Sequence, residues 1–221
     1  MKLLLNALIK FILGLAIVGT LLFLPAGTFA FTNAWLFIAL LFVPIFVVGV
    51  YLFIKAPNLL KKRINAKENE KTQKIVVILS ALLFFTGFIV AGLDYRFDWS
   101  NVPLWLVTVA SIILLISYIL YAEVMRENVY LSRTIEVQKG QKVIDVGMYK
   151  IVRHPMYAVT IWLFLSIPLI LGSFWSLLCF VPYIALIVVR IINEEKLLEN
   201  KLDGYKDYKK KVKYRLIPFI W

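Results

Sequence analysis

The chain has 221 residues, of which 62% are hydrophobic, and it carries a formal net charge of +12. This composition excludes an ordinary soluble domain. The basic charge does not indicate nucleic-acid binding, because the charges lie mostly between and after long apolar runs. A single cysteine, Cys179, and a single histidine, His154, exclude an internal disulfide and a zinc cluster of the usual spacing, so we predict no metal site.

Six apolar runs, each close to the roughly 20 residues that span a bilayer, predict a polytopic bundle of transmembrane helices. They cover residues 3–24, 34–54, 75–93, 103–122, 155–171 and 174–192. The first run could also be a cleavable signal peptide, since Lys2 precedes it and Ala-Gly-Thr-Phe-Ala follows at 26–30. A retained helix is favoured because further spans follow. We therefore expect an all-α, multi-pass membrane protein.

The distribution of basic residues predicts how this bundle is oriented. With six crossings both termini lie on one side of the membrane, and 24 of the 25 Lys and Arg residues fall there. Arg96, in a turn predicted at 94–101, is the exception. Because cytoplasmic loops are enriched in Lys and Arg, we expect the termini to face the cytoplasm. The basic segment 55–74 is interpreted as a solvated cytoplasmic loop rather than a specific site for anionic lipids.

Tryptophans support the same orientation, since they concentrate at membrane interfaces. Those near the opposite face are Trp35, Trp99, Trp105 and Trp175.

The chain is expected to have two regions. Residues 1–122 form four transmembrane helices, and residues 123–221 carry the candidate site. In the second region a polar segment, 123–153, precedes a hairpin of the last two apolar helices, which turns at 172–173. Residues 193–213 are predicted to form an interfacial helix with spaced apolar and basic side chains.

Two polar clusters lie at the open end of this hairpin. His154 begins the fifth apolar run, and the end of the sixth carries Arg190, Glu194 and Glu195. At about 1.5 Å per residue, the two helices climb roughly 26 Å and descend roughly 31 Å. Both clusters should therefore reach one depth near the cytoplasmic surface. Charged groups near membrane depth are costly unless they are paired or line a polar cavity, so we predict a ligand site there.

A purely structural interpretation is also open. Arg190 could snorkel to the surface or pair with Glu194, and His154 could simply precede a helix. Tyr149 and Tyr157 favour a site, because tyrosines can hydrogen-bond a charged ligand and also cover an apolar one. Other site classes fit poorly, since the sequence has no glycine-rich nucleotide motif and no serine in a nucleophile-elbow context.

Three motifs in the C-terminal region occur together. They are Gly147-x-Tyr149-x-x-Val152-Arg153-His154-Pro155-x-Tyr157, Arg190-x-x-x-Glu194-Glu195, and Tyr205-x-x-Tyr208 followed by Arg215-Leu-Ile-Pro-Phe219. This pattern resembles the isoprenylcysteine carboxyl methyltransferase family, whose wider group includes phospholipid N-methyltransferases. The likeness covers residues 121–221. The Arg-His-Pro-x-Tyr and Glu-Glu motifs are specific at this separation, although either alone is weak.

The resemblance implies an integral membrane enzyme that uses S-adenosylmethionine without a Rossmann domain. It implies that the cofactor is held by the segment around the histidine, by a short preceding stretch and by the first glutamate. These residues are Gln141, Lys142, Val143, Ile144, Tyr149, His154, Pro155, Met156, Tyr157 and Glu194. The family often carries histidine where this chain has Gln141. Arg190 corresponds to the arginine that faces the substrate.

Arg190 and Glu195 are the predicted catalytic residues. Methyl transfer to a carboxylate needs alignment and exclusion of water more than it needs a base, because the nucleophile is already ionised. Arg190 could hold such a carboxylate with its planar guanidinium. An amine acceptor would have to lose a proton, and Glu195 is the candidate base for that reaction.

These arguments predict methyl transfer to a lipid-like acceptor, most specifically the carboxylate of a prenylated cysteine. The acceptor would enter from the bilayer and the cofactor from the cytosol. Phospholipid or small-thiol methylation on the same scaffold is the nearest alternative. A non-catalytic membrane scaffold or transporter subunit is another, although neither polar mid-span residues nor repeated halves are evident.

Overall fold

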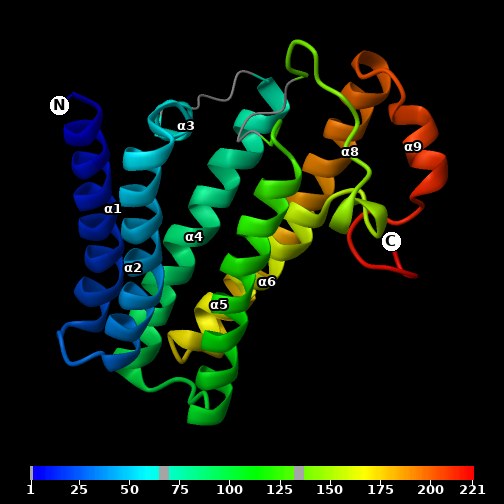
Figure 1. Ribbon diagram of the computed structural model, residues 1–221. Helices are drawn as coiled ribbons and strands as arrows, with labels where there is room; N and C mark the ends of the chain where they lie inside the picture. The colour runs from blue at the N-terminus through cyan, green and yellow to red at the C-terminus, as the bar shows by residue number, and fades with distance from the viewer. Residues whose placement is uncertain (1, 65–69, 132–136) are drawn as a thin grey trace.

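The structure, a computed structural model, describes residues 2–64, 70–131 and 137–221 (Figure 1). Every regular element within these ranges is helical, which confirms the predicted all-α class. In chain order the α-helices are α1 (Lys2–Ala26), α2 (Thr32–Lys55), α3 (Pro57–Ile64), α4 (Lys71–Phe97), α5 (Leu104–Glu127), α6 (Pro155–Ile170), α7 (Phe174–Phe180), α8 (Tyr183–Lys201) and α9 (Tyr205–Lys211). A 3-10 helix, η1 (Gly147–Lys150), precedes α6. The middle of the predicted basic loop lies outside the described residues.

Five helical segments are long and apolar enough to cross a membrane, which supports a multi-pass membrane protein. They are α1, α2, α4, α5 and the α7–α8 segment Phe174–Lys201. The predicted fifth crossing corresponds to α6, which is apolar but has only 16 residues. Its length is roughly 24 Å, less than the ~30 Å hydrocarbon core, so α6 differs from the full-length span expected at 155–171.

The helices after this hairpin turn also differ from the prediction. The expected helix 174–192 is interrupted at Val181 and Pro182, where the proline lacks an N–H and its ring disfavours a continuous helix. The chain then remains helical to Lys201, so α8 runs straight through the start of the predicted interfacial helix. Gly204, with a φ of +82°, separates α8 from the short helix α9.

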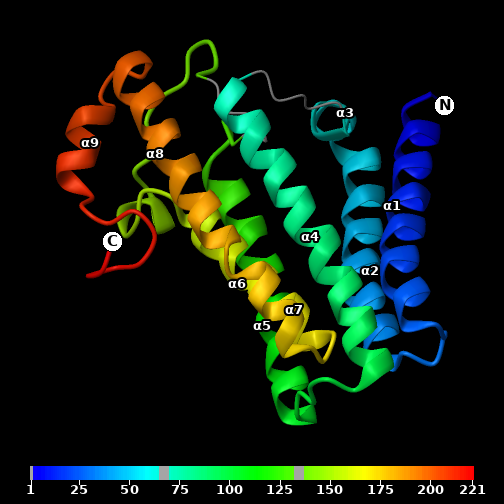
Figure 2. The same cartoon turned by 180° about the vertical axis from the view of Figure 1, so that it is seen from behind.

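The helices form an elongated bundle with α1 and α2 at one edge and α8 and α9 at the other (Figures 1 and 2). One buried apolar cluster joins helices from both halves of the chain, including Leu22 of α1, Phe37 of α2, Phe88 of α4, Leu114 of α5 and Ile170 of α6. The N-terminal helices therefore support the hairpin directly.

A buried carboxylate fixes the turn of the hairpin. Asp94, 1% exposed, accepts hydrogen bonds from the backbone N–H of Ser100 (2.7 Å) and from the Ser100 hydroxyl (2.6 Å). It also accepts a hydrogen bond from the hydroxyl of Ser173, whose oxygen in turn caps α7 by accepting from the N–H of Ser176 (2.9 Å). The end of α4 thus holds the α6–α7 turn in place. It thereby positions α6 and the α7–α8 segment, which both lead to the candidate site.

Candidate active site

The segment that leads into α6 is held by the last residue of α5. Both carboxylate oxygens of Glu127 accept from the N–H of Met148, at 3.0 and 3.1 Å. Gly147 precedes it with a φ of +52°, and a Cβ at this position would collide with the Glu127 carboxylate. Only glycine therefore suits both the backbone conformation and the close approach. This contact sets the position of η1 and of Tyr149 within it.

The C-terminal segment of the chain then covers the start of α6. The N–H of Arg153 donates to the carbonyl of Tyr214 and the N–H of His154 donates to the carbonyl of Arg215, both at 2.9 Å. Pro155 follows as the first residue of α6, where its missing N–H costs no helical hydrogen bond. The backbone of the Arg-His-Pro motif is thus tied to residues about 60 positions later in the sequence.

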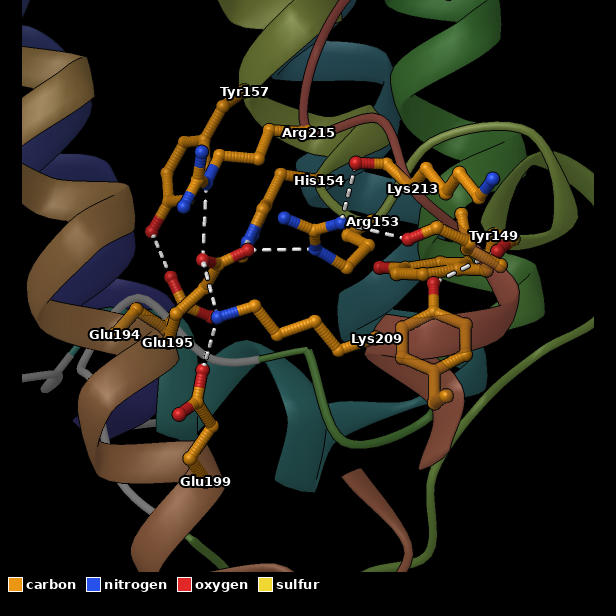
Figure 3. A network of polar contacts seen from close by, with 12 residues as sticks. Tyr149, Arg153, His154, Tyr157, Glu194, Glu195, Glu199, Lys209, Lys213 and Arg215 are labelled. Atoms are coloured by element: carbon orange, nitrogen blue, oxygen red, sulfur yellow. Dashed lines mark hydrogen bonds and ion pairs between the residues drawn. The ribbon is translucent and has the colours of Figure 1, made fainter. Parts of the chain in front are cut away.

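Glu195 of α8 is the centre of a buried ionic network (Figure 3). Its Oε1 accepts from Arg153 Nε at 2.7 Å and lies 3.3 Å from His154 Nε2, and its Oε2 accepts from Arg215 Nε at 3.0 Å. The Nζ of Lys209 is 3.9 Å from Oε2. Glu195 is 3% exposed. A buried carboxylate needs such compensation, so these contacts hold Glu195 in its ionised form.

This arrangement does not fit the base role predicted for Glu195. Both carboxylate oxygens are engaged by cationic groups, which stabilise the ionised form and make the carboxylate a poor proton acceptor. Arg153, which the sequence arguments gave no separate role, is instead a main partner. Its Nη1 also donates to the carbonyls of Val212 and Lys213, at 2.7 and 2.8 Å. Glu195 is therefore a structural link between α8, the α6 entrance and the C-terminal segment.

The neighbouring carboxylate, Glu194, points to a different set of partners. Its Oε2 accepts from the hydroxyl of Tyr157 at 2.6 Å, and the same hydroxyl accepts from Arg190 Nε at 2.9 Å. The guanidinium of Arg190 also lies over the Tyr157 ring, 5.9 Å from its centre. Tyr157 thus joins Arg190 and Glu194 in one hydrogen-bonded chain.

A partly enclosed pocket with an empty volume of about 820 Å³, including its open mouth, lies between η1, α6, α8 and α9. Nine of the predicted cofactor residues line it: Gln141, Lys142, Val143, Ile144, Tyr149, His154, Met156, Tyr157 and Glu194. Pro155 and Arg190 do not, although Arg190 reaches the wall through Tyr157. The structure therefore brings the two sequence clusters together, and their binding roles stay predictions.

Several pocket residues carried no predicted role. These are Asn128, Tyr130, Leu131, Arg153, Leu198, Leu202, Tyr205 and Tyr208. Arg153, Tyr205 and Tyr208 belong to the quoted motifs, and that membership was the signal that could have identified them. The remaining residues belong to no such motif: Leu198 and Leu202 at the end of α8, and Asn128, Tyr130 and Leu131 after α5. Their position depends on how the loops fold over the pocket.

Tyrosine hydroxyls give this pocket a neutral polar wall. Asn128 Nδ2 donates to the hydroxyl of Tyr149 at 2.9 Å, and burial raises the pKa of Tyr149 to about 12, so the hydroxyl stays protonated at physiological pH. The hydroxyl of Tyr208 donates to the Tyr149 carbonyl at 2.8 Å. The hydroxyl of Tyr205 is buried and has no hydrogen-bond partner within the described structure. Such a group is costly to bury, and a bound ligand could satisfy it.

Comparison with known proteins is informative for the same part of the chain. Residues 104–203 match the phospholipid methyltransferase family. This match supports the resemblance noted from the motifs, and its range includes η1, α6 and all of α8. Within the described ranges, no group of three or more His, Cys, Asp or Glu side chains could hold a metal ion.

The similarity of this chain to individual proteins is lower than 30% sequence identity in the two cases below. The chain is 29% identical over 140 residues to the uncharacterized protein YpbQ of Bacillus subtilis (strain 168), which covers 63% of this chain and 82% of that protein. A solved structure of the eukaryotic intramembrane Ras methyltransferase ICMT aligns with 100% of this chain and 88% of its own length, at 19% identity and a TM-score of 0.45.

Replacing Glu195 with glutamine tests the ionic network. Glu195→Gln keeps the side-chain shape but leaves Arg153 and Arg215 without their carboxylate, and the loss of one partner from a buried ion pair costs roughly 3 kcal/mol or more. We expect a clear fall in the unfolding temperature of the purified protein in detergent. The control is Glu199→Gln, one turn further along α8, which removes only the more exposed contact with Lys209. Equal unfolding temperatures for the two variants would contradict the proposed role of Glu195.

Proposed function

We propose that the protein is an integral membrane methyltransferase that transfers a methyl group from S-adenosylmethionine to a lipid-like acceptor. The observation that carries this proposal is the Tyr157 hydroxyl, which connects the polar pocket to Arg190 through its hydrogen bonds with Glu194 and Arg190. Tyr157 thus belongs both to the proposed pocket for the methyl donor and to the proposed anchor of the acceptor, Arg190. The family match over residues 104–203 supports the same class of enzyme.

The residues of the pocket fit the chemical groups of S-adenosylmethionine. When bound, this cofactor supplies a methyl group on a positively charged sulfur, which a nucleophile displaces in line. Glu194 can accept from a cationic or hydroxyl group, and the unpartnered hydroxyl of Tyr205 can bond a polar group. The backbone and side chains of 141–144 form a further wall. This set offers one carboxylate, several neutral hydroxyls and an apolar face, as a charged nucleoside requires.

Arg190 is the proposed anchor of the acceptor. It extends from α8 to the hydroxyl of Tyr157, outside the set of residues that line the pocket. A guanidinium can orient a carboxylate through two parallel hydrogen bonds, and such alignment is the main requirement for an in-line displacement. Arg190 would then hold the acceptor oxygen toward the pocket, while Tyr157 separates the guanidinium from Glu194.

The engagement of Glu195 favours an acceptor that is already an anion. Glu195 is held by Arg153 and Arg215, and Glu194 already accepts a hydrogen bond from Tyr157. Glu195 is therefore not arranged to take a proton from an ammonium group. A carboxylate acceptor, such as that of a prenylated cysteine, needs no base and is therefore the proposed substrate class.

Phospholipid methylation is the second candidate, because the matching family is described as phospholipid methyltransferases. For an amine acceptor the proton would have to leave to a group other than Glu195, since both oxygens of Glu195 are engaged by Arg153 and Arg215. A small thiol could react as a thiolate without a base, and it would use the same Arg190 anchor.

The chemistry of the labelled product distinguishes these candidates. Purified protein is incubated with methyl-labelled S-adenosylmethionine and a total membrane extract, and the lipid product is treated with mild alkali. We expect the label to be released as volatile methanol, because a methyl ester hydrolyses while N-methyl and S-methyl bonds do not. Label that stays non-volatile after alkali would contradict the carboxylate proposal, and the absence of any labelled product would contradict a methyltransferase of lipids.

If Arg190 holds the acceptor and the pocket holds the cofactor, Arg190→Ala should affect turnover and cofactor affinity differently. Because Arg190 lies outside the pocket lining, we expect turnover to fall by at least about 100-fold, as for the loss of a positioning contact, with the affinity for S-adenosylhomocysteine nearly unchanged. Isothermal titration calorimetry measures the affinity, and the methyl-transfer assay measures the turnover. Lys196→Ala, an exposed position on the same helix, is the control and should change neither. Parallel loss of binding and turnover in Arg190→Ala would contradict this division.

A further inference from the structure

An apolar groove lies at the edge of the bundle that is farthest from the candidate active site. It is formed by α1, α2 and the loop between them, which Figures 1 and 2 show at the opposite edge from α8 and α9. Its empty volume is about 1170 Å³, including its open side. The walls include Leu15, Gly19, Phe23, Phe29, Trp35 and Ile38. The proposed methyl transfer uses none of these residues.

Aromatic rings shape the loop end of the groove. The ring of Phe23 lies 4.7 Å from that of Trp35 and 5.2 Å from that of Phe29, measured between centres. The indole N–H of Trp35 donates to the carbonyl of Phe29 at 2.8 Å. This contact holds the indole in a defined orientation, with its polar edge satisfied and its face available to an apolar chain. Tryptophans so placed are typical of the boundary between hydrocarbon and headgroups.

Arg96 places a positive charge at the same end of the groove. Its Nη1 is 3.5 Å from the position that a Cβ at Gly27 would take, and Gly27 lines the groove. Arg96 is exposed, and no acidic oxygen in the described parts of the chain lies within ion-pair distance of it. Its guanidinium carbon lies 5.5 Å from the centre of the Phe97 ring. The guanidinium therefore lies next to Gly27, one of the residues that line the groove.

We propose that this groove binds an anionic diacyl phospholipid. One acyl chain would lie against Phe23, Trp35 and the surface around Gly19, and the lipid phosphate would accept hydrogen bonds from Arg96. A guanidinium binds phosphate through paired N–H donors, and the contact is strengthened where lipid reduces access of water. The ligand would come from the leaflet opposite the active site, where the sequence has no other Lys or Arg. The site is independent of the proposed methyltransferase activity.

A simpler role for Arg96 is to complement the dipole of α4, since it lies in the last turn of that helix. That role requires only a positive charge near the helix end. It does not explain why the guanidinium lies against a loop glycine at the mouth of an apolar groove. The two roles differ in whether a bound lipid is selected by its headgroup.

The test compares phosphatidylglycerol and phosphatidylcholine with identical acyl chains, added to the purified full-length protein in detergent. Native mass spectrometry gives the bound fraction, and thermal unfolding gives an independent measure of binding. For the unmodified protein we expect phosphatidylglycerol to bind at least about tenfold more tightly, as the loss of a charge-assisted hydrogen bond predicts. Arg96→Gln should reduce this preference to near unity while leaving phosphatidylcholine binding unchanged. Arg96→Lys should retain part of it.

A second pair of variants tests the groove itself. Gly19→Leu adds a side chain that fills the groove, and binding of both lipids should fall at least about tenfold. Gly49→Leu is the matched control on α2, because an added Cβ there meets no atom within 4 Å and Gly49 does not line the groove. It should bind both lipids as the unmodified protein does. Equal affinities for the two lipids in the unmodified protein, or a preference that survives Arg96→Gln, would overturn the proposal. If Gly19→Leu bound both lipids as tightly as Gly49→Leu, that result would also overturn the proposal.

Discussion

The carboxylate of Glu195 is the contact on which the candidate active site depends. It is buried on α8, and its partners Arg153, His154 and Arg215 come from the start of α6 and from the C-terminal segment. Removing a partner from a buried charge is costly, so the carboxylate and these basic side chains stabilise one another. The network therefore fixes three separate parts of the chain in one arrangement, and the pocket is the space that this arrangement encloses.

The opposite end of the hairpin is fixed by a second buried carboxylate. Asp94 holds the α6–α7 turn through Ser173, while Glu195 holds the open end. Between the two, α6 and α8 pack through Tyr157, Tyr183 and Ile187. An imidazole, two tyrosines and a glutamate from distant parts of the sequence can share a pocket because both ends of the hairpin are held. The proposed division between donor pocket and acceptor anchor follows from where Tyr157 and Arg190 lie along these helices.

Much of this organisation could be predicted from the sequence. Apolar run lengths identified the helical bundle, and the spacing across the hairpin indicated that His154 and the two glutamates would meet. The details that failed depend on local backbone chemistry or on tertiary partners. Pro182 interrupts the last apolar run, and α8 continues through charged residues that resembled an interfacial helix. The separate partners of Glu194 and Glu195 could not be predicted, because the C-terminal segment that supplies Arg215 carries no signal for where it folds back.

The most direct test of this account is a structure determined with excess S-adenosylhomocysteine. The account predicts density for the nucleoside in the pocket between η1, α6, α8 and α9, with a hydrogen bond to Glu194 and another to the Tyr205 hydroxyl. The contact between Glu195 and Arg215 should be unchanged, since neither residue lines the pocket. Density for the ligand at any other place on the protein, with this pocket empty, would contradict the assignment of the pocket as the methyl-donor site.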